Sequence, residues 1–147
     1  MSNEIYTTIT SGKEAKQKIR NGIDKIANVV GSTMGYQGRL ALISKGGLPY
    51  SSKDGVSVAE AIYLEDSVES LACETAKEAA RKSVEESSDG TTATLVLLQA
   101  FLNNSLDELD KGKKSAIEIK NEIEYSRDLI VKHLEEIAVP LTSENIY

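Results

Sequence analysis

The chain turns at Ser88-Asp89-Gly90-Thr91-Thr92 and continues at once into Ala93-Thr94-Leu95-Val96-Leu97-Leu98, its most apolar stretch. Further apolar residues follow as far as residue 109, at Phe101, Leu102, Leu106 and Leu109. They overflow a single helical stripe, which is typical of a helix that is covered on most sides. We therefore predict a central core helix from Thr91 to about Leu109.

Four further helices are predicted from one-sided apolar spacing and from start and stop signals. One begins at a Ser11–Glu14 capping box and stops at Gly31, a short one spans residues 56–62, and a third runs from about Asp66 to Glu86. The last begins at a Ser115–Glu118 capping box and ends before Pro140. The three longer ones should turn these residues inward: Ile19, Ile23, Ile26 and Val30; then Val68, Leu71 or Ala72, Thr75 or Ala76 and Ala79; and finally Ile119, Ile123, Ile130, Leu134 and Ile137.

Residues 35–55 lose the helical period and are predicted to form a β-hairpin. Leu40-Ala41-Leu42-Ile43 and Tyr50-Ser51-Ser52 have strand composition, and Gly46-Gly47-Leu48-Pro49 between them is typical of a turn. Glu4 to Thr10 is predicted to be a short strand, because β-branched and aromatic residues suit a pleated surface. The fold class expected is mainly α and multihelical, with a hairpin stem loop and a short N-terminal strand.

Composition narrows the class of protein. The 147 residues suit one domain at ~100–200 residues per domain, and a net charge of −6 disfavours nucleic acid or an anionic membrane as partner. Cys73 is the single cysteine, so no internal disulfide can form, and we expect it to be a small buried hydrophobe. His133 is expected to be a surface histidine. The first ten residues lack signal-peptide character, and no run approaches ~18 apolar residues, so we expect a cytoplasmic protein.

The turn at Asp89-Gly90-Thr91-Thr92 is the first candidate site. A helix N-terminus presents unpaired amides and a positive dipole end, and a glycine with two hydroxyl residues lets donors approach an anion. Asp89 would repel a phosphate unless a divalent cation lay between them, which favours Mg²⁺ with a nucleotide. The alternative is an ordinary helix start, with Asp89 or Thr91 as its N-cap.

Two other loop-to-helix junctions add to this interpretation. Lys53-Asp54-Gly55 supplies a cation for phosphate charge and a carboxylate that could orient water, although a plain turn has the same composition. Thr33-Met34-Gly35 offers a glycine for close backbone approach to a ligand. Neither Gly-x-x-x-x-Gly-Lys-[Ser/Thr] nor Gly-x-Gly-x-x-Gly occurs, so nucleotide binding here needs another architecture.

Several separated motifs together resemble the N-terminal equatorial segment of group I chaperonins, the GroEL family. The resemblance covers nearly the whole chain, from about Ile5 to Pro140, with one short deletion in the stem loop. It is carried by Thr33-Met34-Gly35-Tyr36-Gln37-Gly38-Arg39, Lys53-Asp54-Gly55-Val56-Ser57-Val58-Ala59, Leu64-Glu65-Asp66 and Ser88-Asp89-Gly90-Thr91-Thr92-Ala93-Thr94.

The resemblance implies a role for each matched residue in binding ATP. Asp89 would hold Mg²⁺, and Gly90, Thr91, Thr92 and Ala93 would hold the phosphates. Thr33, Met34 and Gly35 would cover the nucleotide. Lys53 would lie beside the phosphates and, with Thr33 and Thr92, beside a monovalent cation such as K⁺. Asp54 would be the catalytic carboxylate that positions the hydrolytic water.

Departures from the family pattern affect three positions. Tyr36 replaces the proline that stiffens the nucleotide loop, Ala93 replaces a threonine, and Ser88 replaces a glycine. One hydroxyl contact to the phosphates is therefore missing.

The resemblance also implies a division of the chain and a set of partners. Residues 1–138 would belong to the ATP-binding equatorial domain, and residues 139–147 to the connection toward an intermediate domain. The parent protein would be an ATPase that couples ATP binding and hydrolysis to the folding of client proteins. It would form rings with other chaperonin subunits and work with a co-chaperonin.

Family members are several times longer, so this chain would hold half of an active site. The missing half would leave apolar surface and strand edges open, which predicts an oligomer or an aggregation-prone fragment. Two alternatives stay open: a truncated, non-catalytic chaperonin-like module that acts through strand pairing, and an unrelated helical bundle in which Asp89-Gly90-Thr91-Thr92 is only a cap.

Overall fold

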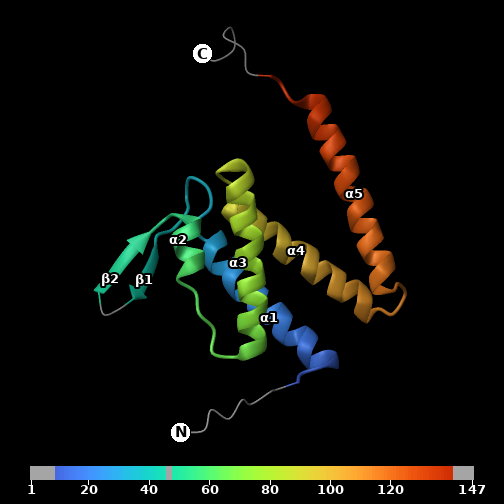
Figure 1. Cartoon of the computed structure of the whole chain (residues 1–147), viewed down its shortest axis with the longest axis horizontal. Helices are drawn as coiled ribbons and strands as arrows, with labels where there is room; N and C mark the ends of the chain where they lie inside the picture. The colour runs from blue at the N-terminus through green and yellow to red at the C-terminus, as the bar shows by residue number, and fades with distance from the viewer. Residues whose placement is uncertain (1–8, 46–47, 141–147) are drawn as a thin grey trace. The chain divides into compact units, whose positions relative to one another are not determined.

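The chain is mainly helical, with one β-hairpin (Figure 1). The computed structural model describes residues 9–45 and 48–140. It divides into two compact units, and the boundary between them along the chain falls between Asn104 and Ser105, inside the helix Thr91–Asp110. The elements in chain order are α1 (Gly12–Gly31), β1 (Ala41–Lys45), β2 (Leu48–Ser52), α2 (Gly55–Glu60), α3 (Ser67–Ser87), α4 (Thr91–Asp110) and α5 (Ala116–Ile137).

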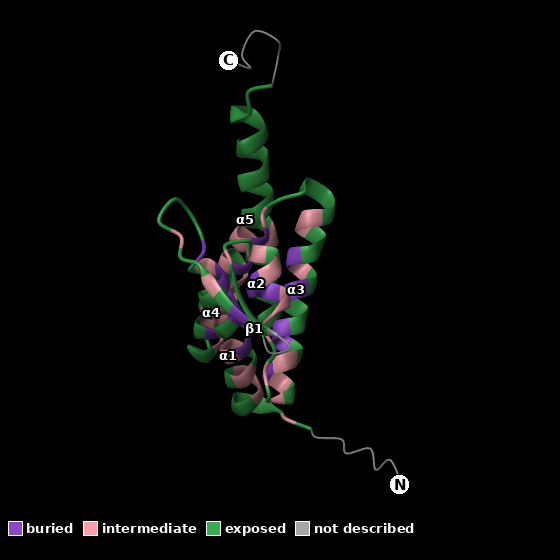
Figure 2. Ribbon diagram, turned by 90° about the vertical axis from the view of Figure 1, so that its left-hand side faces the viewer, coloured by how far each residue is buried: buried purple, intermediate pink, exposed green. Residues whose placement is uncertain are grey.

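The core of the first unit lies where α1 packs against α3 (Figure 2). The predicted α1 face is largely confirmed, because Ile23, Ile26 and Val30 are buried, whereas Ile19 is partly exposed. The two helices come so close at Gly22 that a Cβ there would lie 2.4 Å from the carbonyl oxygen of Glu69. Small side chains are needed at this crossing, which explains the alanine-rich face of α3.

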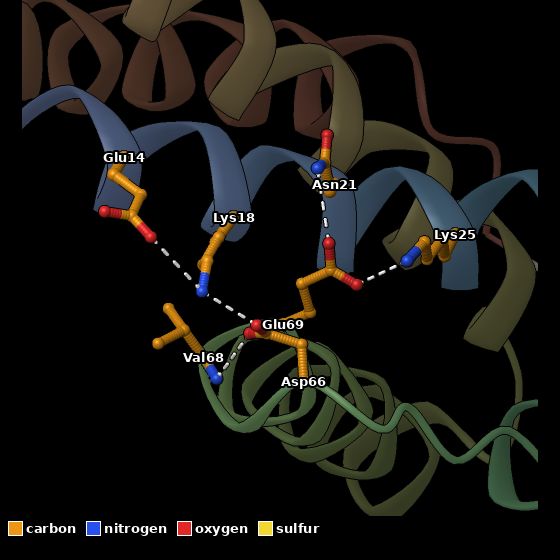
Figure 3. Close-up of polar contacts among 7 residues, drawn as sticks. All are labelled: Glu14, Lys18, Asn21, Lys25, Asp66, Val68 and Glu69. Carbon is orange, nitrogen blue, oxygen red and sulfur yellow. Dashed lines mark hydrogen bonds and ion pairs between the residues drawn. The ribbon is translucent and has the colours of Figure 1, made fainter. Parts of the chain in front are cut away.

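Ion pairs bind α1 to the start of α3 (Figure 3). The Lys18 ammonium lies 2.8 Å from the Asp66 carboxylate, and Asn21 and Lys25 both donate to Glu69. The hydrogen bond from Lys18 lowers the pKa of Asp66, and the one from Lys25 lowers the pKa of Glu69. Asp66 is also the N-cap of α3. One carboxylate therefore starts α3 and fastens it to α1.

The predicted inward face of α3 left two alternatives open, and the structure selects the alanine in each. Ala72 and Ala76 are buried, whereas Leu71 and Thr75 are exposed, so the helix is rotated toward the alanine of each pair. This rotation brings the smallest side chains against α1, where a leucine would not fit. The buried residues of α3 are Glu69, Ala72, Cys73, Ala76, Lys77 and Ala80.

The two predicted capping boxes have different outcomes. At Ser115 the box is confirmed, since the hydroxyl accepts from the Glu118 amide and the Glu118 carboxylate accepts from the Ser115 amide. At Ser11 it is wrong: in the described part of the chain the Ser11 side chain accepts no capping hydrogen bond. Gly12 has φ of +64°, so the backbone leaves the geometry that a capping box requires.

The hairpin is confirmed, with slightly longer strands than expected. β1 and β2 pair antiparallel with Ala41 opposite Ser52 and Ser44 opposite Pro49, so Pro49 belongs to the strand and not to the turn. Proline is tolerated there because, among the described residues, the sheet has two strands and the outer edge of each pairs with no third strand. Of the predicted strand Glu4–Thr10, residues 4–8 lie outside the described residues, and Ile9 and Thr10 are not in a strand.

The prediction that α4 is covered on most sides is wrong for the described residues. Leu95 is fully buried, but Leu97 is 56% exposed and Phe101 is about half exposed. In the first unit α4 is fastened along one side to α1, where Asp24 accepts hydrogen bonds from Gln99 and Asn103. Leu98 and Leu102 pack against the core and are partly buried, whereas Leu97 and Phe101 lie on the part of α4 that this core does not cover.

The second unit consists of the end of α4 and α5. Of the predicted inward residues of α5, Ile119 is buried and Ile123 is partly buried, whereas Ile130, Leu134 and Ile137 are exposed. Periodicity therefore marked an apolar face correctly, but within its own unit α5 is covered only near its start. Among the described residues no helix is sufficiently long and apolar to cross a membrane.

Candidate functional site

Glycine contacts bring two of the predicted loop motifs together and place the end of α1 beside them. A Cβ on Gly55, the first residue of α2, would lie 2.4 Å from Thr92 Oγ1 and 3.5 Å from Val30 Cγ1. A Cβ on Gly31, at the end of α1, would lie 3.3 Å from Val96 Cγ2. The starts of α2 and α4 and the end of α1 therefore meet at one place in the first unit. The sequence alone did not contain this proximity.

The turn before α4 is held by serine hydroxyls. Ser83 and Ser87 both donate to the main-chain oxygen of Asp89, at 3.2 and 3.0 Å. Ser88 and Gly90 have φ of 60° and 93°, so the chain reverses between α3 and α4 in a left-handed conformation. The Asp89 carboxylate is exposed. Among the described residues, the one hydrogen bond given for it comes from the adjacent Gly90 amide, at 2.6 Å, so it can accept further ligands while its backbone is held in place.

The start of α4 differs from the ordinary cap considered above. The Gly90 carbonyl accepts the Thr94 amide at 2.8 Å, so Gly90 takes the cap position. The amides of Thr91, Thr92 and Ala93 precede the first helical hydrogen bond and have no acceptor within the helix. Neither Asp89 nor Thr91 caps them among the described residues. These amides remain available to an anionic ligand.

Asp54 is the N-cap of α2. Its Oδ2 accepts from the Ser57 amide at 2.8 Å and from the Ser57 hydroxyl at 2.6 Å, and Oδ1 accepts from the Val56 amide at 3.4 Å. The Ser57 bonds lower the pKa of Asp54, so the carboxylate is ionised at neutral pH. Oδ1 has one long bond and can accept a further one from water. Lys53, next to it, is exposed.

The loop after α1 is internally bonded. Thr33 is buried, and its hydroxyl donates to the Val30 carbonyl at 2.7 Å. A Cβ on Gly38 would lie 2.0 Å from the Thr33 carbonyl oxygen, which makes glycine obligatory at that close approach. Met34, Gly35 and Tyr36 are exposed on this loop, and Gly35 has φ of +76°. Met34, Gly35 and Tyr36 are therefore exposed to solvent, while Thr33 and Gly38 hold the two ends of the loop together.

A cavity of about 200 Å³ lies beside the start of α4. Of the described residues that line it, Thr91 belongs to the predicted site, whereas Lys53, Asp54 and Asp89 do not line it. Lys77 does, and sequence reasoning missed it, because a lysine in an alanine-rich helix gives no sign of burial. In the described part of the chain no three His, Cys, Asp or Glu side chains gather as a metal site. Asp89 would thus need ligand oxygens and water to complete a Mg²⁺ shell.

Comparison with known families shows which family the chain belongs to. The TCP-1/cpn60 chaperonin family matches residues 26–146, which include all three loop motifs. The chain belongs to this chaperonin family. The predicted resemblance and fold class are thereby confirmed.

Two of the solved structures that the chain resembles belong to a phage chaperonin. Two crystal forms of the chaperonin gp146 from bacteriophage EL 2 (Pseudomonas aeruginosa), both in the presence of ATP-BeFx, match with TM-scores of 0.75 and 0.72 and identities of 30% and 32%. The matches cover 92% and 88% of this chain, and 24% and 23% of the phage chain. The chain therefore spans about a quarter of the length of that chaperonin.

Two predictions on single residues lie outside the site. Cys73 is buried in the core, as expected, and burial raises the pKa of its thiol. His133 is exposed on α5, with Nδ1 3.9 Å from the Glu136 carboxylate, which agrees with a surface histidine. Neither residue takes part in the convergence of the three loops.

Proposed function

We propose that this chain is the nucleotide-binding part of a chaperonin subunit and binds ATP with Mg²⁺ at the start of α4. The observation that carries the proposal is the contact of Gly55 with Thr92, which leaves no room for a Cβ and unites Lys53-Asp54 with the turn at Asp89. A free helix start, an exposed carboxylate and a lysine are then adjacent. This set of donors fits a magnesium-bound triphosphate.

Each residue of the site has a role that follows from its chemistry. The amides of Thr91, Thr92 and Ala93 would donate to phosphate oxygens, Gly90 would allow close approach of the backbone to them, and Lys53 would balance their charge. Asp89 would hold Mg²⁺, which when bound neutralises phosphate charge. Main-chain and hydroxyl oxygens of Thr33, Lys53 and Thr92 are of the kind that binds K⁺. The proposed magnesium ligand is Asp89, and the proposed nucleotide-binding residues are Thr33, Met34, Gly35, Lys53, Asp89, Gly90, Thr91, Thr92 and Ala93.

Asp54 is the proposed catalytic residue. Its ionised carboxylate is anchored to α2 through Oδ2, and Oδ1 can accept a hydrogen bond from the attacking water. In the longer subunit further groups would complete the site. That subunit would be an ATPase that couples nucleotide binding and hydrolysis to the folding of client proteins in the cytoplasm, with a co-chaperonin.

Open surfaces of the first unit support assembly with other chaperonin subunits. Leu42 on β1 is 84% exposed, and no third strand from residues 9–45 or 48–140 pairs with either strand of the hairpin. An apolar hollow of about 660 Å³ also lies among α1, α3 and α4, with Ile19, Leu71 and Leu98 in its walls. Surfaces of this kind associate in water. They equally suit the second candidate function, a non-catalytic module that acts through strand pairing.

Calorimetry with Mg-ATP tests the proposal. We expect the unaltered chain to bind Mg-ATP and Asp89→Ala to lose most of the magnesium-dependent affinity. Glu86→Ala is the matched control, because Glu86 is another exposed carboxylate close to the same turn. Equal heats for the unaltered chain and Asp89→Ala, or no heat from either, would reject the site. Binding of ATP without its hydrolysis would agree with a chain that holds only half of the active site.

A further inference from the structure

The cavity of about 200 Å³ separates α2 from α3. Its walls come from the outer side of α2, from the facing side of α3 and from the first residue of α4. Apolar packing between the two helices is therefore incomplete, and α2 has six residues, too few to be stable without tertiary support. The lining residues are Val56, Ala59, Glu60, Lys77, Ala80, Arg81, Val84, Glu85 and Thr91.

Lys77 crosses from α3 to the far end of α2. Its ammonium donates to the Ile62 carbonyl oxygen at 2.6 Å and to the Glu74 carboxylate at 2.7 Å, and it lies 4.7 Å from the centroid of the Tyr63 ring. Lys77 is only 2% exposed. A buried ammonium needs such partners, so its position is tied to that of Ile62, two residues beyond α2.

Arg81 makes the second connection across the same cavity. Its Nε and Nη2 donate to the two carboxylate oxygens of Glu60, the last residue of α2, at 2.7 and 2.8 Å. A bidentate pair of this kind fixes the relative orientation of both side chains. The two connections lie one helical turn apart on α3 and both hold the C-terminal end of α2.

We propose that Lys77 and Arg81 are positioning residues that hold α2 in place and thereby set the position of Asp54 at its other end. The inference rests on the proposed nucleotide function and adds to it two residues that touch neither phosphate nor metal. A six-residue helix is about 9 Å long and moves as a rigid body, so a displaced C-terminal end also displaces its N-cap. The contact of Gly55 with Thr92 leaves no slack for such a shift.

The test compares folded variants by two measurements. Lys77→Met removes the buried connection, and Lys82→Met is the matched control, because Lys82 on the same helix makes an exposed ion pair with Glu78. Peptide-resolved hydrogen exchange over residues 55–62, measured without any ligand, reports how firmly α2 is held against the rest of the unit. Calorimetry reports the affinity for Mg-ATP. We expect Lys77→Met to raise exchange in this segment about tenfold and to weaken Mg-ATP binding about tenfold, a change of ~1.4 kcal/mol, while exchange in α1 stays unchanged.

A charge exchange separates positioning from general stability. Arg81→Glu should raise exchange over residues 55–62, and the double variant Glu60→Arg/Arg81→Glu should restore the protection. Unchanged exchange and unchanged Mg-ATP affinity in folded Lys77→Met and Arg81→Glu would overturn the proposal, as would exchange that rises while the affinity stays the same. If the unaltered chain binds no Mg-ATP, the nucleotide function fails, and the exchange measurements still decide whether the two residues hold α2.

Discussion

Substitution of Gly55 by alanine tests whether α2 and α4 meet as described. The added Cβ would lie 2.4 Å from Thr92 Oγ1, about 0.6 Å short of the 3.0 Å below which real Cβ contacts are essentially never found. Overpacking of this kind costs about 1–3 kcal/mol. Without the clash, glycine to alanine would stabilise the protein by about 0.4–1 kcal/mol through the unfolded chain. We expect a net loss of about 1–2 kcal/mol for Gly55→Ala.

A second substitution, Thr92→Ala, should relieve the clash that Gly55→Ala creates. Thr92→Ala removes Oγ1, and the atoms then nearest to the new Cβ are Val30 Cγ1 at 3.5 Å and Thr92 Cβ at 3.7 Å, which are ordinary contacts. In the Thr92→Ala background, Gly55→Ala should therefore stabilise the unit instead of destabilising it. The coupling between the two changes should reach about 1–3 kcal/mol, as for residues in direct contact.

Cys73 provides the assay, because it is the single cysteine and lies buried in the core of the first unit. The rate at which a thiol reagent labels it under native conditions reports the free energy of opening this unit. The four proteins of the cycle are compared at the same pH, since burial also raises the pKa of the thiol. An equal effect of Gly55→Ala in both backgrounds would refute the contact, and so would a single substitution that stabilises the protein.

Three further outcomes are expected. Leu95→Ala should cost about 2–5 kcal/mol in the same assay because Leu95 is fully buried, whereas exposed Leu97→Ala should stay within about 0.5 kcal/mol; similar losses would contradict the assigned face of α4. Because its Ser57 bonds lower the pKa of Asp54 below the ordinary 3.8, the capping contribution is complete above that value and is lost as pH falls through the lowered pKa. The protection of the α2 amides, taken as the ratio of the intrinsic to the observed exchange rate at each pH, should then fall on acidification below about pH 4, and Asp54→Asn should flatten this profile. Ser115→Ala should destabilise the start of α5 by about 1 kcal/mol, seen as faster exchange at residues 116–119; unchanged exchange there would argue against the capping box.

The helices and the hairpin were predictable because their signals are local. Apolar spacing located α1, α3, α4 and α5 to within a residue or two at most ends, and the Ser115–Glu118 box started α5 as expected. The capping box predicted at Ser11 does not form, although the sequence has the Ser-x-x-Glu pattern. Gly12 takes a left-handed conformation, which that pattern does not reveal.

Which side of each helix is covered depended on neighbours that a sequence pattern does not name. Of the alternatives Leu71 and Ala72, the structure buries Ala72, because α1 approaches α3 at Gly22 with room only for small side chains. Lys77 is buried too, because the Ile62 carbonyl and the Glu74 carboxylate accept hydrogen bonds from its ammonium. α4 carries apolar residues on most of its surface, yet only part of that surface has a wall in the first unit. The amount of apolar surface was predictable, and its burial was not.

The sequence by itself determined the chemistry of this protein: a glycine-containing turn with an acid before an apolar helix, a Lys-Asp-Gly junction, and the chaperonin family that shares them. Only the tertiary structure decided that these motifs meet, because Gly55 and Thr92 lie 37 residues apart and the distance between them follows from how α1, α2 and α4 pack. It alone also assigned Asp54 to the cap of α2 and gave buried Lys77 its partners. Local propensity acts through neighbouring residues, whereas a site is assembled by contacts between distant ones.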